Sequence, residues 1–303
     1  MIEVKNLNKN FGNIRALDDF SFHFERSKIT VLSGADGSGK STLFKLILGL
    51  TKLDSGEIIL KDEPLSTDFS RVTEIAGYMP EKFSLYPDLT VEENLNFFSD
   101  IHGVEFKRRE EMKKMLLERT GMIKFRNRRA GALSGGMKQK LSLSSILLSS
   151  PEVLLLDEPT TGVDPLSRIE FFNIIELLKS EGKTIIISTP YLEEAEKGDN
   201  IVFINKGKIR KSGNISELKK NVPFKLFSLI PERNIFEILE ELKKEKRLEG
   251  KVFMKGKYIK FISKDDDDLL SLIPGKQIRE ESPGLEDIYL YYERIANTGG
   301  PDG

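Results

Sequence analysis

Residues 28–49, KITVLSGADGSGKSTLFKLILG, decide the fold of this chain. A short apolar run, Ile29–Leu32, ends in a glycine-rich turn, and a helix-forming stretch begins at Ser41. Glycine permits backbone dihedrals that other residues avoid, so successive N–H groups of such a turn can face a polyphosphate. A chance strand–turn–helix gives the same letters, but the strand and helix on either side are the context that phosphate binding needs. The pattern G-x-x-x-x-G-K-[ST] therefore predicts a phosphate-binding loop, whose residues are Gly34, Ala35, Asp36, Gly37, Ser38, Gly39, Lys40, Ser41 and Thr42.

Three features of this loop suit a polyphosphate with a bound metal ion. Lys40 would reach the β- and γ-phosphates, and the Ser41 hydroxyl would take one position on Mg²⁺. The N-terminus of the following helix adds the positive end of its dipole.

A second candidate site lies at the end of the apolar run Val153–Leu156, which stops at Asp157 and Glu158. Such a run predicts a buried parallel strand, and open α/β sheets bind ligands at the carboxyl ends of their strands. We expect Asp157 to hold Mg²⁺, directly or through water, and Glu158 to orient or deprotonate an attacking water. The alternative is a strand that merely ends in solvated acids.

The composition limits other kinds of chemistry. The 303 residues include no cysteine and two histidines, which excludes disulfides, thiol catalysis and metal sites built from cysteine or histidine clusters. The formal net charge of −1 gives no reason to expect nucleic acid as a partner. We find no signal-peptide pattern at the N-terminus, and no apolar run approaches the ~20 residues that span a bilayer.

The order of the elements predicts an α/β fold with a smaller second domain. Strand-like alternation fills residues 1–32, and strands and helices then follow each other from 153 to 205. We place the domain boundary at Pro223, so that 1–222 form the first domain. Residues 223–294 show short strands between amphipathic helices, which indicates a small α+β domain.

Residues 82–135 are predicted to form a helical insert in the first domain. Thr90 and Glu93 have the spacing of a capping box, and two amphipathic helices follow it. A strand is expected around Glu74–Met79, just before this insert. Arg126 and the two arginines after it are expected to form a solvated face.

Two stretches near the C-terminus are expected to be a solvated helix start and a disordered tail. The acidic run Asp265–Asp268 lacks the alternating ligands and the glycine of a calcium loop, so we expect a solvated helix start. The tail, residues 295–303, is expected to be disordered.

Two further stretches offer contacts to a nucleotide. Phe11 lies in the turn between the first two strands, where its ring either packs on the turn or stacks on a nucleobase. Ser134 precedes a helix and can cap it, and Gly135 and Gly136 leave their N–H groups accessible to an anion. Any capped helix start gives the second pattern.

Taken in order, these stretches resemble the ATP-binding-cassette (ABC) transporter ATPases over residues 1–220. The resemblance rests on the loop GADGSGKS, the segment GYMPEKFSLYPDLTVEENL, the signature-like LSGGMKQKL, the Walker B strand LLLDEP and the D-loop TGVDP. This order and spacing separate the family from other phosphate-loop NTPases. The C-terminal part, ending in SPGLEDIYL, is more distantly similar to the accessory domain of exporter ATPases for drugs, polysaccharides or sodium.

The resemblance implies an ATPase with an antiparallel β subdomain that works as a dimer with ATP and Mg²⁺. ATP would lie between the phosphate loop of one chain and Ser134–Gly136 of a second ABC ATPase chain, with Phe11 against the adenine. The cycle would drive separate transmembrane permease subunits from the cytoplasmic face of the membrane, with the helical insert as docking surface. The implied residues are, for catalysis, Glu158, Glu81 and Asp164, and, for the metal, Ser41, Asp157 and Glu81.

Two positions depart from the family pattern. Glu81 stands where the family has glutamine, and a carboxylate can still approach Mg²⁺ or water. Pro190 stands at the position of the switch histidine, and proline has neither a side-chain donor nor a base. Either Glu158 carries slow hydrolysis, or the chain is a weak, nucleotide-gated regulatory subunit paired with a histidine-bearing cassette. A third alternative is a soluble, non-transport member of the family; those typically carry two cassettes or long coiled coils.

Overall fold

The computed structural model describes residues 1–65, 69–82, 85–231, 234–245, 248, 251–263 and 278–295. The chain divides into two compact units, Met1–Ile209 and Arg210–Gly303. This division falls ahead of the boundary expected at Pro223, because helix α8 (Ile215–Lys220) packs against α10 (Leu285–Leu290) of the second unit. The acidic run at 265–268 and the tail from residue 296 lie outside the described residues.

The main sheet has the strand order β10-β9-β3-β8-β7-β6, in which β9 to β6 belong to the first unit and the edge strand β10 contains the boundary at Ile209. The pairs β6–β7, β7–β8, β8–β3 and β3–β9 are parallel. Strands β3, β7 and β8 are buried along their whole length, which explains why their sequences are continuous apolar runs. The carboxyl ends of these three neighbouring strands therefore meet at one edge. The strands are β3 (Ile29–Ser33), β6 (Ala76–Met79), β7 (Val153–Asp157), β8 (Thr184–Thr189), β9 (Asn200–Asn205) and β10 (Lys208–Gly213).

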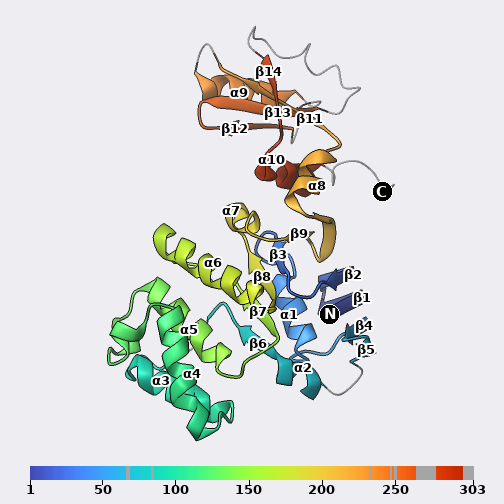
Figure 1. The fold of residues 1–303 in the computed structure, drawn as a ribbon. Helices are drawn as coiled ribbons and strands as arrows, with labels where there is room; N and C mark the ends of the chain where they lie inside the picture. The colour runs from blue at the N-terminus through green and yellow to red at the C-terminus, as the bar shows by residue number, and fades with distance from the viewer. Residues whose placement is uncertain are drawn as a thin grey trace. The chain divides into compact units, whose positions relative to one another are not determined.

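Helices pack on this sheet, as Figure 1 shows. Helix α1 contacts β7, α5 contacts β6, α6 contacts β8, and α7 contacts β3 and β8. The strand expected around Glu74–Met79 begins only at Ala76, because Glu74 and Ile75 end a short helix, α2. The helices are α1 (Lys40–Ile47), α2 (Ser70–Ile75), α5 (Gly135–Leu147), α6 (Pro165–Ser180) and α7 (Leu192–Ala195).

A second, antiparallel sheet of the first unit has the strand order β2-β1-β4-β5. Its apolar face shares one hydrophobic core with α1 and the main sheet, in which Phe20 and Phe24 lie with Phe44 and Leu155. The shared core fixes the β1–β2 hairpin beside the phosphate loop. The strands are β1 (Ile2–Phe11), β2 (Ile14–Phe24), β4 (Ser55–Leu60) and β5 (Glu63–Pro64).

The predicted helical insert is present as α3 (Val91–Ile101) and α4 (Phe106–Arg119), which pack against each other and against α5 (Figure 1). The Thr90 hydroxyl accepts a hydrogen bond from the Glu93 N–H (3.1 Å), and the Thr90 N–H donates to the Glu93 carboxylate (2.7 Å). The predicted capping box is therefore confirmed.

The second unit contains a four-stranded antiparallel sheet in the order β12-β13-β11-β14. On this sheet the rings of Phe227 and Phe261 stack with their centroids 5.2 Å apart. Strand β14 was not predicted, because its sequence is mostly charged. The elements are α8, β11 (Lys225–Leu229), α9 (Ile235–Lys244), β12 (Val252–Lys255), β13 (Tyr258–Ser263), β14 (Ile278–Glu281), α10 and a π-helical turn at Tyr291–Ile295.

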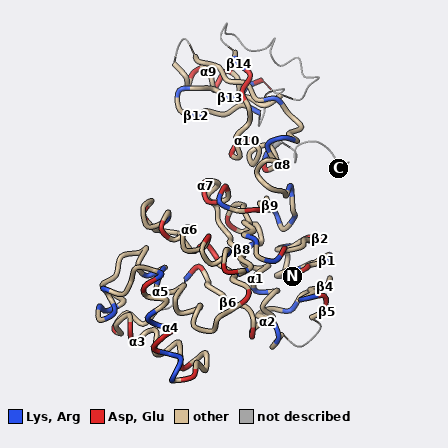
Figure 2. The backbone as a smooth tube through the Cα atoms, in the orientation of Figure 1, with Lys and Arg blue, Asp and Glu red and all other residues tan. Residues whose placement is uncertain are grey.

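Charge is mixed along the chain. Figure 2 shows Lys and Arg interspersed with Asp and Glu on the elements of the first unit. Within the described part of the chain, no helix is both long and apolar enough to cross a membrane.

Candidate nucleotide site

The phosphate loop connects β3 to α1 and is closed in by neighbouring backbone. A Cβ atom on Gly34 would lie 2.2 Å from the carbonyl oxygen of Ile204. Gly39 has a φ of +112°, and a Cβ atom there would lie 2.4 Å from the carbonyl oxygen of Ala16. The fold therefore requires glycine at both positions.

Lys40 is held inside this loop. Its ammonium donates to the carbonyl oxygens of Gly34 (2.8 Å) and Ala35 (3.0 Å), and its side chain is 4% exposed. The same nitrogen lies 3.6 Å from Oε1 of Glu158. Nearby, the hydroxyl of Ser38 is buried without a hydrogen-bond partner in the described residues. The Lys40 ammonium, which the loop carbonyls hold in place, and the unpaired Ser38 hydroxyl are both groups that can bind phosphate oxygens.

Strand register brings the acid pair to the same edge. Strand β8 lies between β3 and β7, and Asp157 pairs with Ser188. The Ser188 hydroxyl donates to Oδ1 of Asp157 (2.5 Å) and accepts from the N–H of Glu158 (3.0 Å). The hydroxyl of Tyr78, on β6, lies 3.5 Å from Oδ2 of Asp157. Ser188 therefore sets the positions of both acids at once.

Glu158 is an unusual carboxylate. Its backbone has a φ of +48°, a left-handed conformation that is uncommon for residues other than glycine. Burial raises the pKa of its carboxyl, Lys40 opposes that rise, and Asp36, Asp157 and Glu81 add to it. A carboxylate with raised proton affinity, close to the phosphate loop, is suited to act as a general base.

The side chains available for Mg²⁺ are few. Among the described residues, no group of three or more His, Cys, Asp or Glu side chains is arranged to hold a metal ion. Magnesium bound to nucleotides characteristically takes one or two protein carboxylates and completes its shell with phosphate and water. Ser41 in the first turn of α1 and Asp157 at the end of β7 fit that requirement, and Glu81 follows β6 closely.

Ser134, Gly135 and Gly136 lie at the start of α5. The Ser134 hydroxyl caps the helix by accepting from the N–H of Met137 (3.3 Å), as predicted. A Cβ atom on Gly136 would lie 2.3 Å from Cβ of Ser167, and one on Gly135 would lie 3.2 Å from the carbonyl oxygen of Gly162. The signature-like segment therefore packs on the D-loop, residues 161–165, and Ser134 and Gly135 are exposed.

Asp164 has a visible structural use. Its carboxylate caps α6 by accepting from the N–H of Ser167 (2.9 Å), and this hydrogen bond lowers the pKa of Asp164. The catalytic role that we assigned to Asp164 stays a prediction. The nucleobase contact assigned to Phe11 is likewise untested; its ring is 49% exposed at the end of β1, with Nζ of Lys9 5.1 Å from the ring centroid.

Sequence reasoning missed a buried carboxylate, Glu194 on α7. It accepts from the hydroxyls of Thr160 (2.5 Å) and Thr189 (2.6 Å), and it forms an ion pair with Arg168 (3.1 Å). Glu194 thus joins the loop after β7 to the end of β8, directly before exposed Pro190.

Part of this arrangement had a signal in the sequence. Ser188 and Thr189 are polar residues at the end of a buried apolar strand, the same signal that identified Asp157. Glu194 had none, because it lies in the charged run LEEAE and only the face of α7 decides which acid is buried.

The chain is similar in sequence to known proteins. A family model described as ABC transporter matches residues 17–161. The Nod factor export ATP-binding protein I of Burkholderia lata is 37% identical over 208 residues, which are 68% of this chain and 68% of that protein. The glutamine transport ATP-binding protein GlnQ of Escherichia coli is 34% identical over 228 residues, or 74% of this chain and 95% of GlnQ.

Another relative is longer than this chain. The Probable multidrug ABC transporter ATP-binding protein YbhF of Escherichia coli is 38% identical over 86% of this chain, but the match spans only 46% of YbhF. Among solved structures, an ATP-binding subunit of an ABC transporter aligns with a TM-score of 0.64 at 28% identity, over 73% of this chain and 92% of its own. A dimeric bacterial ABC transporter cassette aligns with a TM-score of 0.64 at 25% identity, over 71% and 98%.

Proposed function

Because this chain belongs to the family of ABC transporter ATP-binding proteins, we propose that it is an ATPase subunit that powers a separate membrane permease, and that the transport is export. The observation that carries the proposal is the approach of Lys40 to Glu158, 3.6 Å apart, which joins the phosphate loop to the acid pair in one cluster. The names of two relatives, which refer to multidrug transport and Nod factor export, support the direction.

The residues of the cluster divide the work of hydrolysis. ATP supplies the phosphoryl group, and a bound Mg²⁺ would neutralise part of the charge on its phosphate oxygens. Lys40 would pair with phosphate oxygens, and Ser41, Asp157 and Glu81 would hold the metal. Glu158 takes a proton from the water whose oxygen bonds to the γ-phosphorus, while the bond from that phosphorus to the bridging oxygen of ADP breaks. Its raised pKa makes it a stronger base for this step.

The second half of the site comes from a partner chain in this proposal. Ser134 and Gly135 are exposed, and Gly135 and Gly136 lie against Gly162 and Ser167. That arrangement supports contact with a nucleotide held by another ABC ATPase chain, with Phe11 against the adenine. The helical insert docks on the permease, which keeps the chain at the membrane as a peripheral subunit.

A second candidate function rests on Pro190, which follows β8 at the edge where β3 and β7 end. Proline offers no side-chain hydrogen bond to a γ-phosphate and no base. A chain that binds ATP and dimerises without turnover would regulate a more active cassette instead.

Steady-state ATP turnover of the full chain across a range of protein concentrations separates the two candidates. A self-sufficient dimer gives turnover that rises more than linearly with protein, and Glu158→Gln abolishes it. ATP binding without turnover at any concentration favours the regulatory subunit. Lys40→Ala is the control for the site itself, and unchanged ATP affinity in that variant would refute the whole assignment.

A further inference from the structure

Two stretches of the helical insert run side by side. Residues 87–92 follow the segment that begins at Glu81, and residues 126–131 end just before the signature-like segment. Their pairing includes an isolated antiparallel bridge between Thr90 and Arg129. Four backbone hydrogen bonds of 2.8 to 2.9 Å complete it: Val91 N to Arg128 O, Glu92 N to Arg126 O, Ala130 N to Leu89 O, and Gly131 N to Pro87 O. We call this pair of stretches the ribbon.

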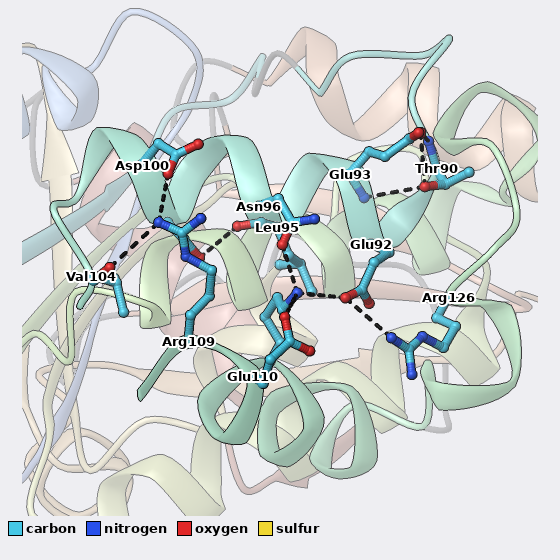
Figure 3. A network of polar contacts seen from close by, with 12 residues as sticks. Thr90, Glu92, Glu93, Leu95, Asn96, Asp100, Val104, Arg109, Glu110 and Arg126 are labelled. Atoms are coloured by element: carbon cyan, nitrogen blue, oxygen red, sulfur yellow. Dashed lines mark hydrogen bonds and ion pairs between the residues drawn. The ribbon is translucent and has the colours of Figure 1, made fainter. Parts of the chain in front are cut away.

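A buried lysine from α4 holds the ribbon. Lys113 is 2% exposed, and its ammonium donates to Oε1 of Glu92 (2.5 Å) and to Oδ1 of Asn96 (2.6 Å). The same Glu92 oxygen lies 3.2 Å from Arg126, on the other stretch of the ribbon. Figure 3 shows the Glu92 side chain between Arg126 on one side and Asn96 and Glu110 on the other. Glu92 therefore connects both stretches of the ribbon to α4.

The charges of this cluster balance. Lys113 also pairs with Glu110 of its own helix (2.6 Å), so two cations face two carboxylates. Burying an ion pair costs desolvation, and replacing both partners of such a pair with well-packed apolar side chains is often neutral or stabilising, whereas removing one partner alone is destabilising. What the ion pair adds is orientation: it holds Glu92, and with it the ribbon, in one place on α4.

We propose that Lys113 and Glu92 are positioning residues for the nucleotide site of the partner chain. They fix the ribbon, and the ribbon fixes Ser134–Gly136, which begin three residues after it. The inference rests on the proposed function, in which this segment contacts ATP on a second chain. It predicts that loss of the ion pair damages the site in trans and leaves the chain's own phosphate loop intact.

The test compares two properties of the full-length chain, both in a Glu158→Gln background where hydrolysis does not interfere. The first is the affinity for a fluorescent ATP analogue at protein concentrations where the chain is monomeric. The second is ATP-driven dimerisation, measured by analytical ultracentrifugation. Lys113→Met is expected to keep the first within about twofold and to weaken the second by about tenfold to a hundredfold, the range for a misplaced site.

Glu110→Gln is the matched control. Glu110 contacts the same ammonium, but it lies on α4, not on the ribbon, and its side chain is 66% exposed. Its dimerisation should match the Glu158→Gln parent. If Lys113→Met does not fold, Glu92→Gln keeps the size of the side chain and takes its place.

Normal dimerisation of the folded variant, or a parallel loss of ATP affinity, overturns the proposal. Absence of ATP-driven dimers in the Glu158→Gln parent contradicts the proposed function itself, so the two failures are distinguishable.

Discussion

Ser188→Ala removes one hydroxyl that serves both acids of the candidate site. Its hydrogen bond to Asp157 is made to a charged, buried group, and such bonds contribute about 1.5–3 kcal/mol. The N–H of Glu158 keeps the carbonyl oxygen of Ser188 as an acceptor at 3.1 Å, so the second bond lost costs little. We expect the free energy of unfolding to fall by about 2 kcal/mol.

For a unit of this size, each kcal/mol shifts the melting temperature by about 2–4 °C, so the first unit should melt about 4–8 °C lower. Ser145→Ala is the matched control. Ser145 is equally buried, but its hydroxyl donates only to the carbonyl of Leu141 one turn earlier in its helix. Such back-bonding contributes nothing to helix stability, so the control should change by no more than about 0.5 kcal/mol.

Differential scanning calorimetry of the full chain without nucleotide gives both shifts. The same samples, titrated with ATP with and without Mg²⁺, should show that Ser188→Ala weakens the Mg²⁺-dependent part of binding, because Asp157 loses its orientation. If the two serine variants melt at the same temperature, the reasoning about Ser188 is wrong.

Two further predictions concern buried carboxylates. Folding raises the pKa of the Glu158 carboxyl. The ionised carboxylate therefore lowers the free energy of unfolding at pH values above the folded-state pKa. This loss is absent at pH values below the unfolded-state pKa, because the carboxyl is then protonated in both states. Glu158→Gln should therefore raise the urea midpoint of unfolding at about pH 7. The gain should vanish near about pH 4, where the carboxyl of the parent chain is protonated in the folded and the unfolded state. Equal gains at the two pH values would contradict this. Glu194→Gln leaves Arg168, whose side chain is 23% exposed, without its ion pair. The substitution should lower the free energy of unfolding by about 1–3 kcal/mol, and it should lower kcat more than ATP affinity. Glu193→Gln, on the exposed side of the same helix, is its control, and a similar loss there would remove the special role of Glu194.

Much of the fold could be predicted from the sequence because local patterns and the tertiary structure agree. Buried parallel strands read as apolar runs, and the carboxyl ends of such strands are where Lys40 and Glu158 come together. The start of β6 was misplaced, since Ile75 is apolar in either a helix or a strand.

The remaining parts of the site depend on contacts between distant segments. Ser188 reaches Asp157 only through the β7–β8 register, and Glu194 is buried only because α7 turns that face inward. The cap formed by Asp164 was locally predictable, because an acid followed by proline is a common helix start.

The contact between Gly136 and Ser167 leaves no room between the first turns of α5 and α6. Closely packed helix ends of this kind cannot slide past each other without losing that contact. In the proposed dimer, residues 134–136 and residues 161–165 of one chain therefore keep their relative placement when they meet the partner chain. The two segments then act as one rigid contact surface, and a shift of either one displaces the other.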